Sequence, residues 1–138
     1  MASGVFDLLH PGHIYFLEQS KKLGDELVVL LTNDMVASRT KGELLFDQAS
    51  RAHMVQALAC VDQAIVATET EPTNYYKTVL AIRPDIIALG YDQTFTEQAL
   101  AADLAAHGWQ GKIVRLGQYH QPVSSSQLKN QIRNQKPA

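Results

Sequence analysis

The stretch "GVFDLLHPGHIYFLEQSKKLGDELVVLLTND", residues 4–34, joins two short apolar runs through a segment with helical spacing. The first run covers residues 2–6 and the second covers residues 26–33. The apolar face of the expected helix is formed by Ile14, Phe16, Leu17 and Leu23. Gly24 is well placed to end this helix, because glycine tolerates the backbone that follows a last helical turn. Strand, helix and strand in this order are typical of two parallel strands joined by a crossover helix.

The same alternation continues to the end of the chain. Further apolar runs lie at residues 63–67, 85–90 and 112–117, and near-continuous runs of this length are typical of strands covered on both faces. Helical patterns are expected after a cap at Asp47, behind Pro72 and Thr73 from Tyr75 onwards, over residues 95–108 with Gly108 as the end, and after a cap at Ser124. The pattern predicts an α/β fold, a Rossmann-like doubly wound five-stranded parallel sheet, with residues 1–138 as a single domain.

Composition narrows the class of protein. The chain has 138 residues, 46% of them hydrophobic and 19% charged, which favours a globular domain over a disordered one. Its net charge of −2 gives no basic excess, so no nucleic-acid partner is expected. No apolar run is long enough for a bilayer, and no signal-peptide pattern follows Met1, so we expect no membrane partner and a cytoplasmic protein. Cys60 and Trp109 are interpreted as packing residues.

The loop after the first strand holds the strongest chemical pattern. In doubly wound folds, ligands bind at the carboxyl ends of the strands. Free backbone N–H groups at a helix start attract a phosphate, and Gly12 permits its close approach behind Pro11. His10 and His13 can aim imidazole donors at the same anion, which favours a site for a phosphoryl group in transfer. A capping or packing role is the plainer alternative. A metal site is less favoured because no third ligand accompanies the two histidines.

These residues resemble a known signature. Residues 4–34 are similar to the start of the cytidylyltransferase-like nucleotidyltransferases, in which a G-x-F-D-x-x-H-x-G-H pattern leads into the first helix. The resemblance continues through "RTKG" (39–42), "SRAHMVQALACVDQAIV" (50–66) and "RPDIIALGYDQ" (83–93). Its most similar branches are glycerol-3-phosphate cytidylyltransferase and the archaeal-type FAD synthase. The "LGYDQ" segment looks more like the second.

The resemblance implies a reaction and a set of site residues. An acceptor phosphate attacks the α-phosphorus of a nucleoside triphosphate in line and releases pyrophosphate, with Mg²⁺ bridging the triphosphate oxygens and no covalent enzyme intermediate. The implied catalytic residues are His10, His13 and Lys41. The implied nucleotide-binding residues are Val5, Phe6, His10, Pro11, Gly12, His13, Asp92, Tyr119, Ser124 and Ser125. A homodimer is expected by resemblance alone.

Several positions have an ordinary structural alternative. Lys41, in "RTKG" after the second strand, can reach a phosphate or be an exposed loop lysine. Asp92 can hold a ribose hydroxyl or a base amino group, or merely start the next turn. Arg39, Arg51 and Lys77 are weaker candidates for an acceptor phosphate. Asp7 is interpreted as a carboxylate that shapes its loop.

The last motif departs from the cytidylyltransferase branch, where R-T-x-G-I-S-T-T opens the final helix. Here the matching stretch is "YHQPVSSSQ", residues 119–127, with Tyr119 near the position of the arginine. We therefore favour ATP over CTP and an FMN adenylyltransferase, an FAD synthase. A glycerol-3-phosphate cytidylyltransferase, a catalytically weak nucleotide-binding module and an interaction protein on the same scaffold are the alternatives.

Overall fold

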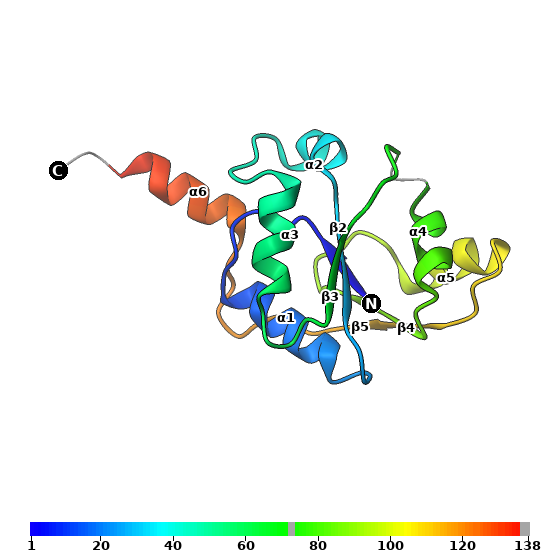
Figure 1. Cartoon of the computed structure of the whole chain (residues 1–138). Helices are drawn as coiled ribbons and strands as arrows, with labels where there is room; N and C mark the ends of the chain where they lie inside the picture. The colour runs from blue at the N-terminus through cyan, green and yellow to red at the C-terminus, as the bar shows by residue number, and fades with distance from the viewer. Residues whose placement is uncertain (72–73, 136–138) are drawn as a thin grey trace.

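The computed structural model describes residues 1–71 and 74–135, and its centre is a five-stranded parallel sheet. The strands are β1 (Ala2–Gly4), β2 (Val28–Leu31), β3 (Gln63–Val66), β4 (Ile86–Leu89) and β5 (Lys112–Arg115). Their spatial order is β3-β2-β1-β4-β5, which confirms the predicted Rossmann-like doubly wound sheet (Figure 1). The order reverses at β1, which pairs with both β2 and β4, so the carboxyl end of β1 is the expected place for a ligand.

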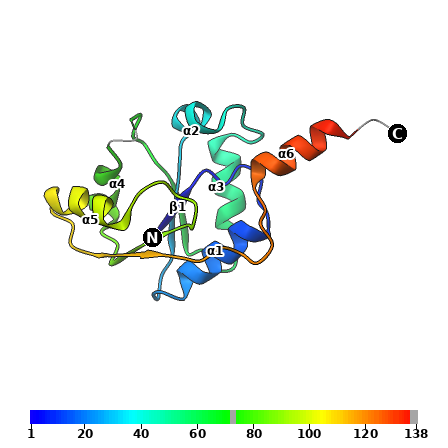
Figure 2. The ribbon, with the colours of Figure 1, turned by 180° about the vertical axis from the view of Figure 1, so that it is seen from behind.

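Four helices cover the two faces of the sheet. On one face lie α1 (Pro11–Lys21) and α3 (Gln48–Gln56), and on the other lie α4 (Tyr75–Ile82) and α5 (Glu97–Ala106) (Figures 1 and 2). The last helix, α6 (Ser125–Asn134), starts beside α1 and projects away from the body. None of the described helices is long and apolar enough to cross a membrane.

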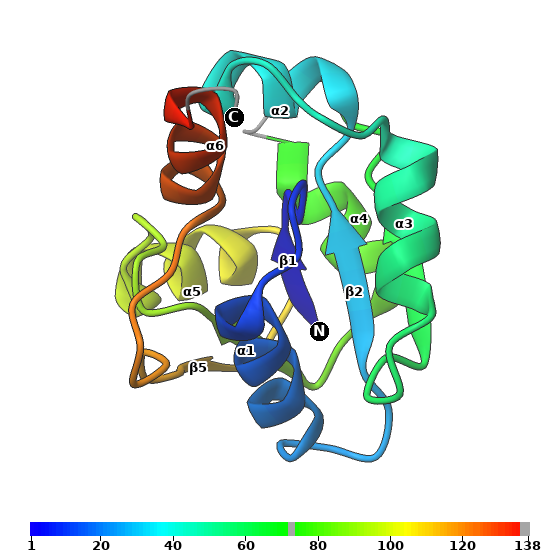
Figure 3. The same ribbon diagram turned by 90° about the vertical axis from the view of Figure 1, so that its left-hand side faces the viewer.

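The remaining helix, α2 (Asp34–Lys41), was not expected from the sequence. It lies above the carboxyl ends of the strands (Figure 3) and is capped by Asn33, whose side-chain oxygen accepts from the Val36 N–H at 3.0 Å. Lys41 is therefore the last residue of a helix rather than part of a loop, and Gly42 follows it with φ at 74°. Pro72 and Thr73, expected just before α4, lie outside the described residues.

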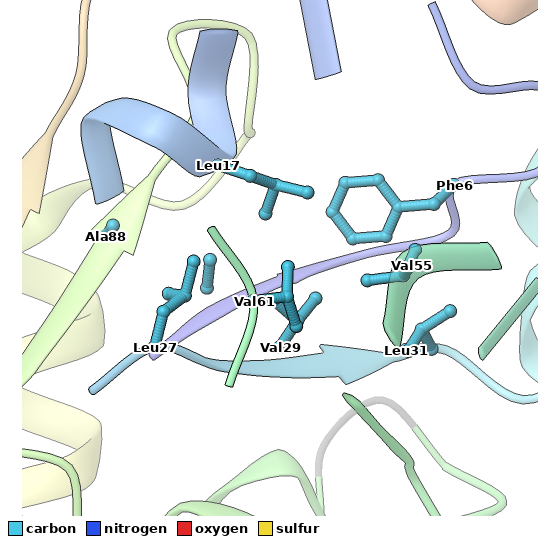
Figure 4. Packing of buried hydrophobic residues seen from close by; sticks show 9 residues of the cluster. Phe6, Leu17, Leu27, Val29, Leu31, Val55, Val61 and Ala88 are labelled. Atoms are coloured by element: carbon cyan, nitrogen blue, oxygen red, sulfur yellow. The ribbon is translucent and has the colours of Figure 1, made fainter. Parts of the chain in front are cut away.

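Two apolar clusters hold the layers together. One joins the sheet to α1 and α3, and its fully buried members include Leu17, Leu31 and Val55 (Figure 4). The other joins the sheet to α4 and α5 and contains Trp109, whose ring nitrogen donates to the Pro84 carbonyl at 2.8 Å, so its predicted packing role is confirmed. Asp47 and Ser124 cap α3 and α6 as expected, and Gly108 follows α5. The first helix ends at Lys21, slightly before Gly24.

Candidate active site

The loop between β1 and α1 begins with a backbone turn at Phe6. The residue has φ at 53°, in the left-handed region that a bulky side chain rarely adopts, and such strain is often found at functional sites. Its ring is 4% exposed and packs between Leu17 and Val55 (Figure 4). A Cβ atom at Gly4 would lie 2.8 Å from this ring, so the turn requires glycine there. The sequence suggested that Phe6 lines a nucleotide pocket, whereas its side chain belongs to the core and its backbone shapes the loop.

The two histidines form one unit at the start of α1. His10 is the N-cap, and its Nδ1 accepts from the His13 backbone N–H at 3.3 Å. Neutral His10 therefore keeps its proton on Nε2, the nitrogen that can face a substrate. The His13 ring stacks on His10 and meets Phe6 edge-on, with centroids 5.2 Å apart. A Cβ atom at Gly12 would lie 3.0 Å from the His10 ring, so glycine keeps the helix start open.

Burial keeps both rings neutral. It lowers the pKa of His13 to about 3, with smaller contributions from the neighbouring His10 and Lys41. Burial also lowers the pKa of His10, against the opposing charge of Asp92. Lys41 and Asp92 are therefore near enough to the histidine pair to influence its pKa values, and a role for either residue in the site stays a prediction. Nδ1 of His13 is buried and has no hydrogen-bond partner among residues 1–71 and 74–135, so a polar partner from a ligand would satisfy it.

The start of α6 lies beside the start of α1. The Ser125 hydroxyl donates to the Leu8 carbonyl at 2.9 Å, and a Cβ atom at Gly12 would lie 3.8 Å from the Val123 carbonyl oxygen. Because Ser125 uses its hydroxyl inside the chain, it can offer only its backbone to an anion. Tyr119 reaches α1 through Tyr15, with ring centroids 5.6 Å apart. Two helix starts with free N–H groups and partial positive charge thus converge on one place, which suits a polyphosphate.

Arg51 lies inside the fold rather than on the surface of the site. It is 0% exposed, and its guanidinium donates to the carbonyls of Val5, Thr32 and Phe46 and to the Asp34 carboxylate at 2.7 Å. The side chain therefore connects the end of β1 to the start of α2 and to α3. The sequence suggested that Arg51 contacts an acceptor phosphate. Because all of these bonds are within the chain, Arg51 instead positions the segments around the site.

Asp7 has the loop-shaping role that the sequence suggested. Its carboxylate is 4% exposed and accepts from the backbone N–H groups of Leu45 and Phe46 and from Lys129 of α6. Burial opposes the ionised form, but the bonds from Lys129 and these N–H groups win and hold the pKa of Asp7 below its ordinary value. Lys129, which sequence reasoning missed, thereby anchors α6 beside the histidine loop. An amphipathic pattern alone gave no signal for it.

The other two candidate cations lie further out. Arg39 is exposed on α2, where it pairs with Glu71 at 3.6 Å and donates to the Thr70 carbonyl at 3.4 Å. Lys77 is exposed on α4, on the face of the sheet opposite α1 (Figure 1). A phosphate contact for either residue stays a prediction.

Comparison with known proteins agrees with this geometry. The family model described as cytidylyltransferase-like matches residues 1–131, which is nearly the whole chain. The chain belongs to the cytidylyltransferase-like family. It is 43% identical over 126 residues to the FAD synthase of Picrophilus torridus, covering 91% of this chain and 88% of that protein. It is 46% identical over 127 residues to the FAD synthase of Thermoplasma volcanium, covering 91% of this chain and 87% of that protein.

A solved structure has the same fold as this cytidylyltransferase-like chain. It is described as the lipopolysaccharide core biosynthesis protein of Thermoplasma volcanium, with a TM-score of 0.78 and 47% identity. The match covers 86% of this chain and 95% of that one. The likeness therefore covers most of this chain.

The described residues offer little to a metal ion on their own. Among residues 1–71 and 74–135, no group of three His, Cys, Asp or Glu side chains is close enough to hold one. Magnesium prefers oxygen ligands and keeps several waters, so triphosphate oxygens suit it better than two stacked imidazoles.

Proposed function

We propose that this chain is an FMN adenylyltransferase, an FAD synthase that joins ATP to FMN. The observation that supports this most directly is the identity with proteins named FAD synthase over about nine tenths of the chain. The histidine pair, the two converging helix starts and Tyr119 in place of an arginine agree with it. Residues 1–138 would then act as one nucleotidyltransferase domain.

The chemistry is a direct displacement at phosphorus. An oxygen of the FMN phosphate attacks the α-phosphorus of ATP, and the bond from this phosphorus to the oxygen bridging to the β-phosphate breaks. The electron pair of that bond leaves with pyrophosphate, which magnesium accompanies as a counter-ion. Positioning and charge neutralisation account for most of the rate in such reactions.

Each site residue has a role in this scheme. His10 and His13 donate to the transferring phosphoryl group, and Lys41 adds a mobile positive charge to a phosphate beside them. The helix starts offer the backbone N–H groups of Gly12, Ser124 and Ser125 to the triphosphate, and Pro11 stiffens the turn before Gly12. Asp92, Tyr119 and the backbone of Val5 and Phe6 bound the nucleoside. Arg39 is the better placed cation for the acceptor, and Lys77 is more remote.

The test measures FAD directly. Purified protein with MgATP and FMN should form FAD and pyrophosphate in equal amounts, separated by chromatography. Calorimetric titration should show binding of MgATP and little binding of MgCTP. Formation of a CDP-linked product from CTP and glycerol 3-phosphate, with no FAD, would establish the cytidylyltransferase alternative. Nucleotide binding without turnover would establish the binding-module alternative.

Two expectations about the cellular form belong to the same proposal. The protein would act as a homodimer, as expected by resemblance, and in the cytoplasm, where ATP and FMN are available. Light scattering at micromolar concentration should give twice the mass of 15.3 kDa. A monomeric mass would contradict the dimer, and recovery of the protein in a membrane fraction would contradict the compartment.

A further inference from the structure

A hollow lies beyond the end of β1, on the face of the sheet covered by α4. Its volume is about 170 Å³. The hollow is lined by the ends of β1 and β2, the segment after β3, the start of α4 and the loop after β4, through Ser3, Thr32, Glu69, Tyr75, Gln93 and Phe95 among others. None of these residues belongs to the nucleotide site described above. The hollow is nevertheless adjacent to that site, because Gly4 lines it from the end of β1 and Gln93 follows Asp92.

The hollow combines aromatic walls with one unsatisfied polar atom. Phe95 and Tyr75 both line the hollow, Phe95 with 50% of its surface exposed and Tyr75 with a hydroxyl whose pKa burial raises to about 12. Oε2 of Glu69 is buried with no hydrogen-bond partner among residues 1–71 and 74–135. A buried acceptor without a donor costs free energy, so a ligand that supplies an N–H group would be bound by it.

Glu69 is held firmly in place. The Asn33 amide donates to the carbonyls of Ala67 and Glu69 at 3.0 and 2.7 Å, while its oxygen caps α2. The segment after β3 is thus fixed to the start of α2, and the carboxylate stays beside the hollow. The Gln93 amide, whose donation to the Ser3 carbonyl spans 3.5 Å, and the Thr32 hydroxyl are donors on the same lining. A lining that offers one acceptor and two donors matches a heterocycle with a ring N–H next to carbonyls.

The geometry of an in-line attack indicates which of the two substrates this hollow would hold. In an in-line displacement the attacking and leaving groups lie on opposite sides of the phosphorus. Pyrophosphate would leave toward the helix starts of α1 and α6, which lie on the other face of the sheet (Figure 3). The acceptor then approaches from the side of β2 and α4, where the hollow lies and where Arg39 stands beside Glu71 of its lining.

We propose that the hollow between β1, β2 and α4 binds the ring system of the acceptor, with Glu69 accepting its ring N–H and Phe95 and Tyr75 packing against its faces. The assignment rests on the proposed FMN adenylyltransferase activity for the identity of the acceptor. At about 170 Å³ the hollow admits one end of an isoalloxazine, smaller than whole-ligand pockets of roughly 300 Å³ or more. The phosphate end then extends toward His10 and His13.

The experiment uses Glu69→Ala, Phe95→Ala and a control, Glu26→Ala, which removes an exposed carboxylate just before β2, at the amino end of that strand. Riboflavin, the ring without the phosphate, is titrated with each protein and followed by flavin fluorescence. Its Kd should rise about tenfold in Glu69→Ala, the loss expected for a charge-assisted bond, and about threefold or more in Phe95→Ala. The KM for FMN should rise in parallel, while the KM for ATP stays within about twofold. The control should match wild type.

The outcomes separate the hollow from the reaction. If wild type forms FAD and both variants bind flavin as wild type does, the hollow is not the binding site of the acceptor ring, and the proposed reaction is unaffected. A raised KM for ATP in place of FMN also overturns it, because the hollow would then hold the nucleotide base. If wild type forms no FAD but flavin binding weakens in the variants, the hollow is a flavin site and the proposed reaction is rejected. If wild type binds no flavin, both proposals fail. Thermal unfolding of Glu69→Ala at or above the wild-type temperature would support a ligand role over a structural one.

Discussion

The imidazole rings of His10 and His13 are stacked, with centroids 3.7 Å apart and planes 21° from parallel. The cap bond from the His13 N–H to Nδ1 of His10 fixes the first ring, and the stack fixes the second against Phe6. Both rings are therefore held in place without a ligand, so the proposed donation to a phosphoryl group would need little reorganisation. His10 thus has two roles, because the same side chain caps α1 and supplies one of the two rings of the proposed site.

Substitution at His10 separates these two roles. Asparagine can still accept from the His13 N–H, whereas alanine cannot, so His10→Ala should lose about 1 kcal/mol of stability that His10→Asn keeps. Both variants lack the ring donor, so both should lower kcat by about a hundredfold or more. Urea unfolding and FAD formation measure the two effects. Near-normal turnover in folded His10→Asn would reject the phosphate-holding role.

The low pKa of His13 predicts how stability depends on pH. Its folded pKa of about 3 lies below the unfolded value of 6.5, so the unfolded chain binds the proton first as pH falls. The contribution of the neutral ring is complete above pH 6.5 and is lost between there and about 3, by at most ~1.4 kcal/mol per pH unit. His13→Asn should flatten the stability curve over this window in urea titrations. An unchanged slope would mean that His13 is not buried in its neutral form.

Arg51 should matter more for folding than for chemistry. Removing its side chain leaves the buried carbonyls of Val5 and Thr32 without a donor and Asp34 without its partner. Arg51→Met should therefore cost about 3–5 kcal/mol by urea unfolding. Arg133→Ala, which breaks an exposed pair with Glu43, should cost less than about 1 kcal/mol. Equal effects of the two substitutions would contradict the internal role of Arg51.

The strands and most helices were predictable because their apolar spacing is local. The runs at 26–33 and 85–90 are too apolar for exposed loops, and α1 begins with Pro11, a residue favoured at the first position of a helix. Helix α2 was missed because only Val36 and Ala37 are buried in it, which is too few for a visible period. Its cap, Asn33, is a local bond to the Val36 N–H, but the second role of Asn33, donating to the Ala67 carbonyl after β3, depends on the tertiary fold.

The site was predictable where a short motif fixes the geometry, and less so where distant segments meet. His10, Gly12 and His13 lie within one turn, so their sequence determines their neighbours. The burial of Arg51 depends on carbonyls from three other segments, and the anchoring of α6 depends on a pair between Asp7 and Lys129 across most of the chain. No local pattern records such contacts. The unsatisfied oxygen of Glu69 was equally unpredictable, because its burial depends on the packing of distant segments.

Loss of the Asp7 to Lys129 pair should loosen α6 without unfolding the sheet. Lys129→Ala leaves the Asp7 carboxylate with its two backbone donors, so the loop at Leu45 and Phe46 stays in place. The helix, which otherwise projects from the body, should then be cut faster by protease at the bonds near Arg133 (Figure 1). The KM for ATP should rise, because the start of α6 forms half of the proposed triphosphate site. Unchanged proteolysis would show that the Ser125 to Leu8 bond is a sufficient anchor.

Substitutions of Lys41 can distinguish an electrostatic role of this side chain from a packing role. It is exposed at the end of α2, yet close enough to His13 to help lower the pKa of that ring. A point charge on a flexible stem should act mainly on a phosphate, so Lys41→Ala should raise the KM of a phosphate-bearing substrate or lower kcat by roughly tenfold or more. Lys41→Arg keeps the charge and should recover part of the loss. Lys112→Ala, which removes an exposed lysine at the start of β5, should have no effect on either constant.

Because an electrostatic contribution is screened by salt, the difference between wild type and Lys41→Ala should shrink as ionic strength rises. A difference that does not change with salt would assign Lys41 to packing of the α2 terminus instead.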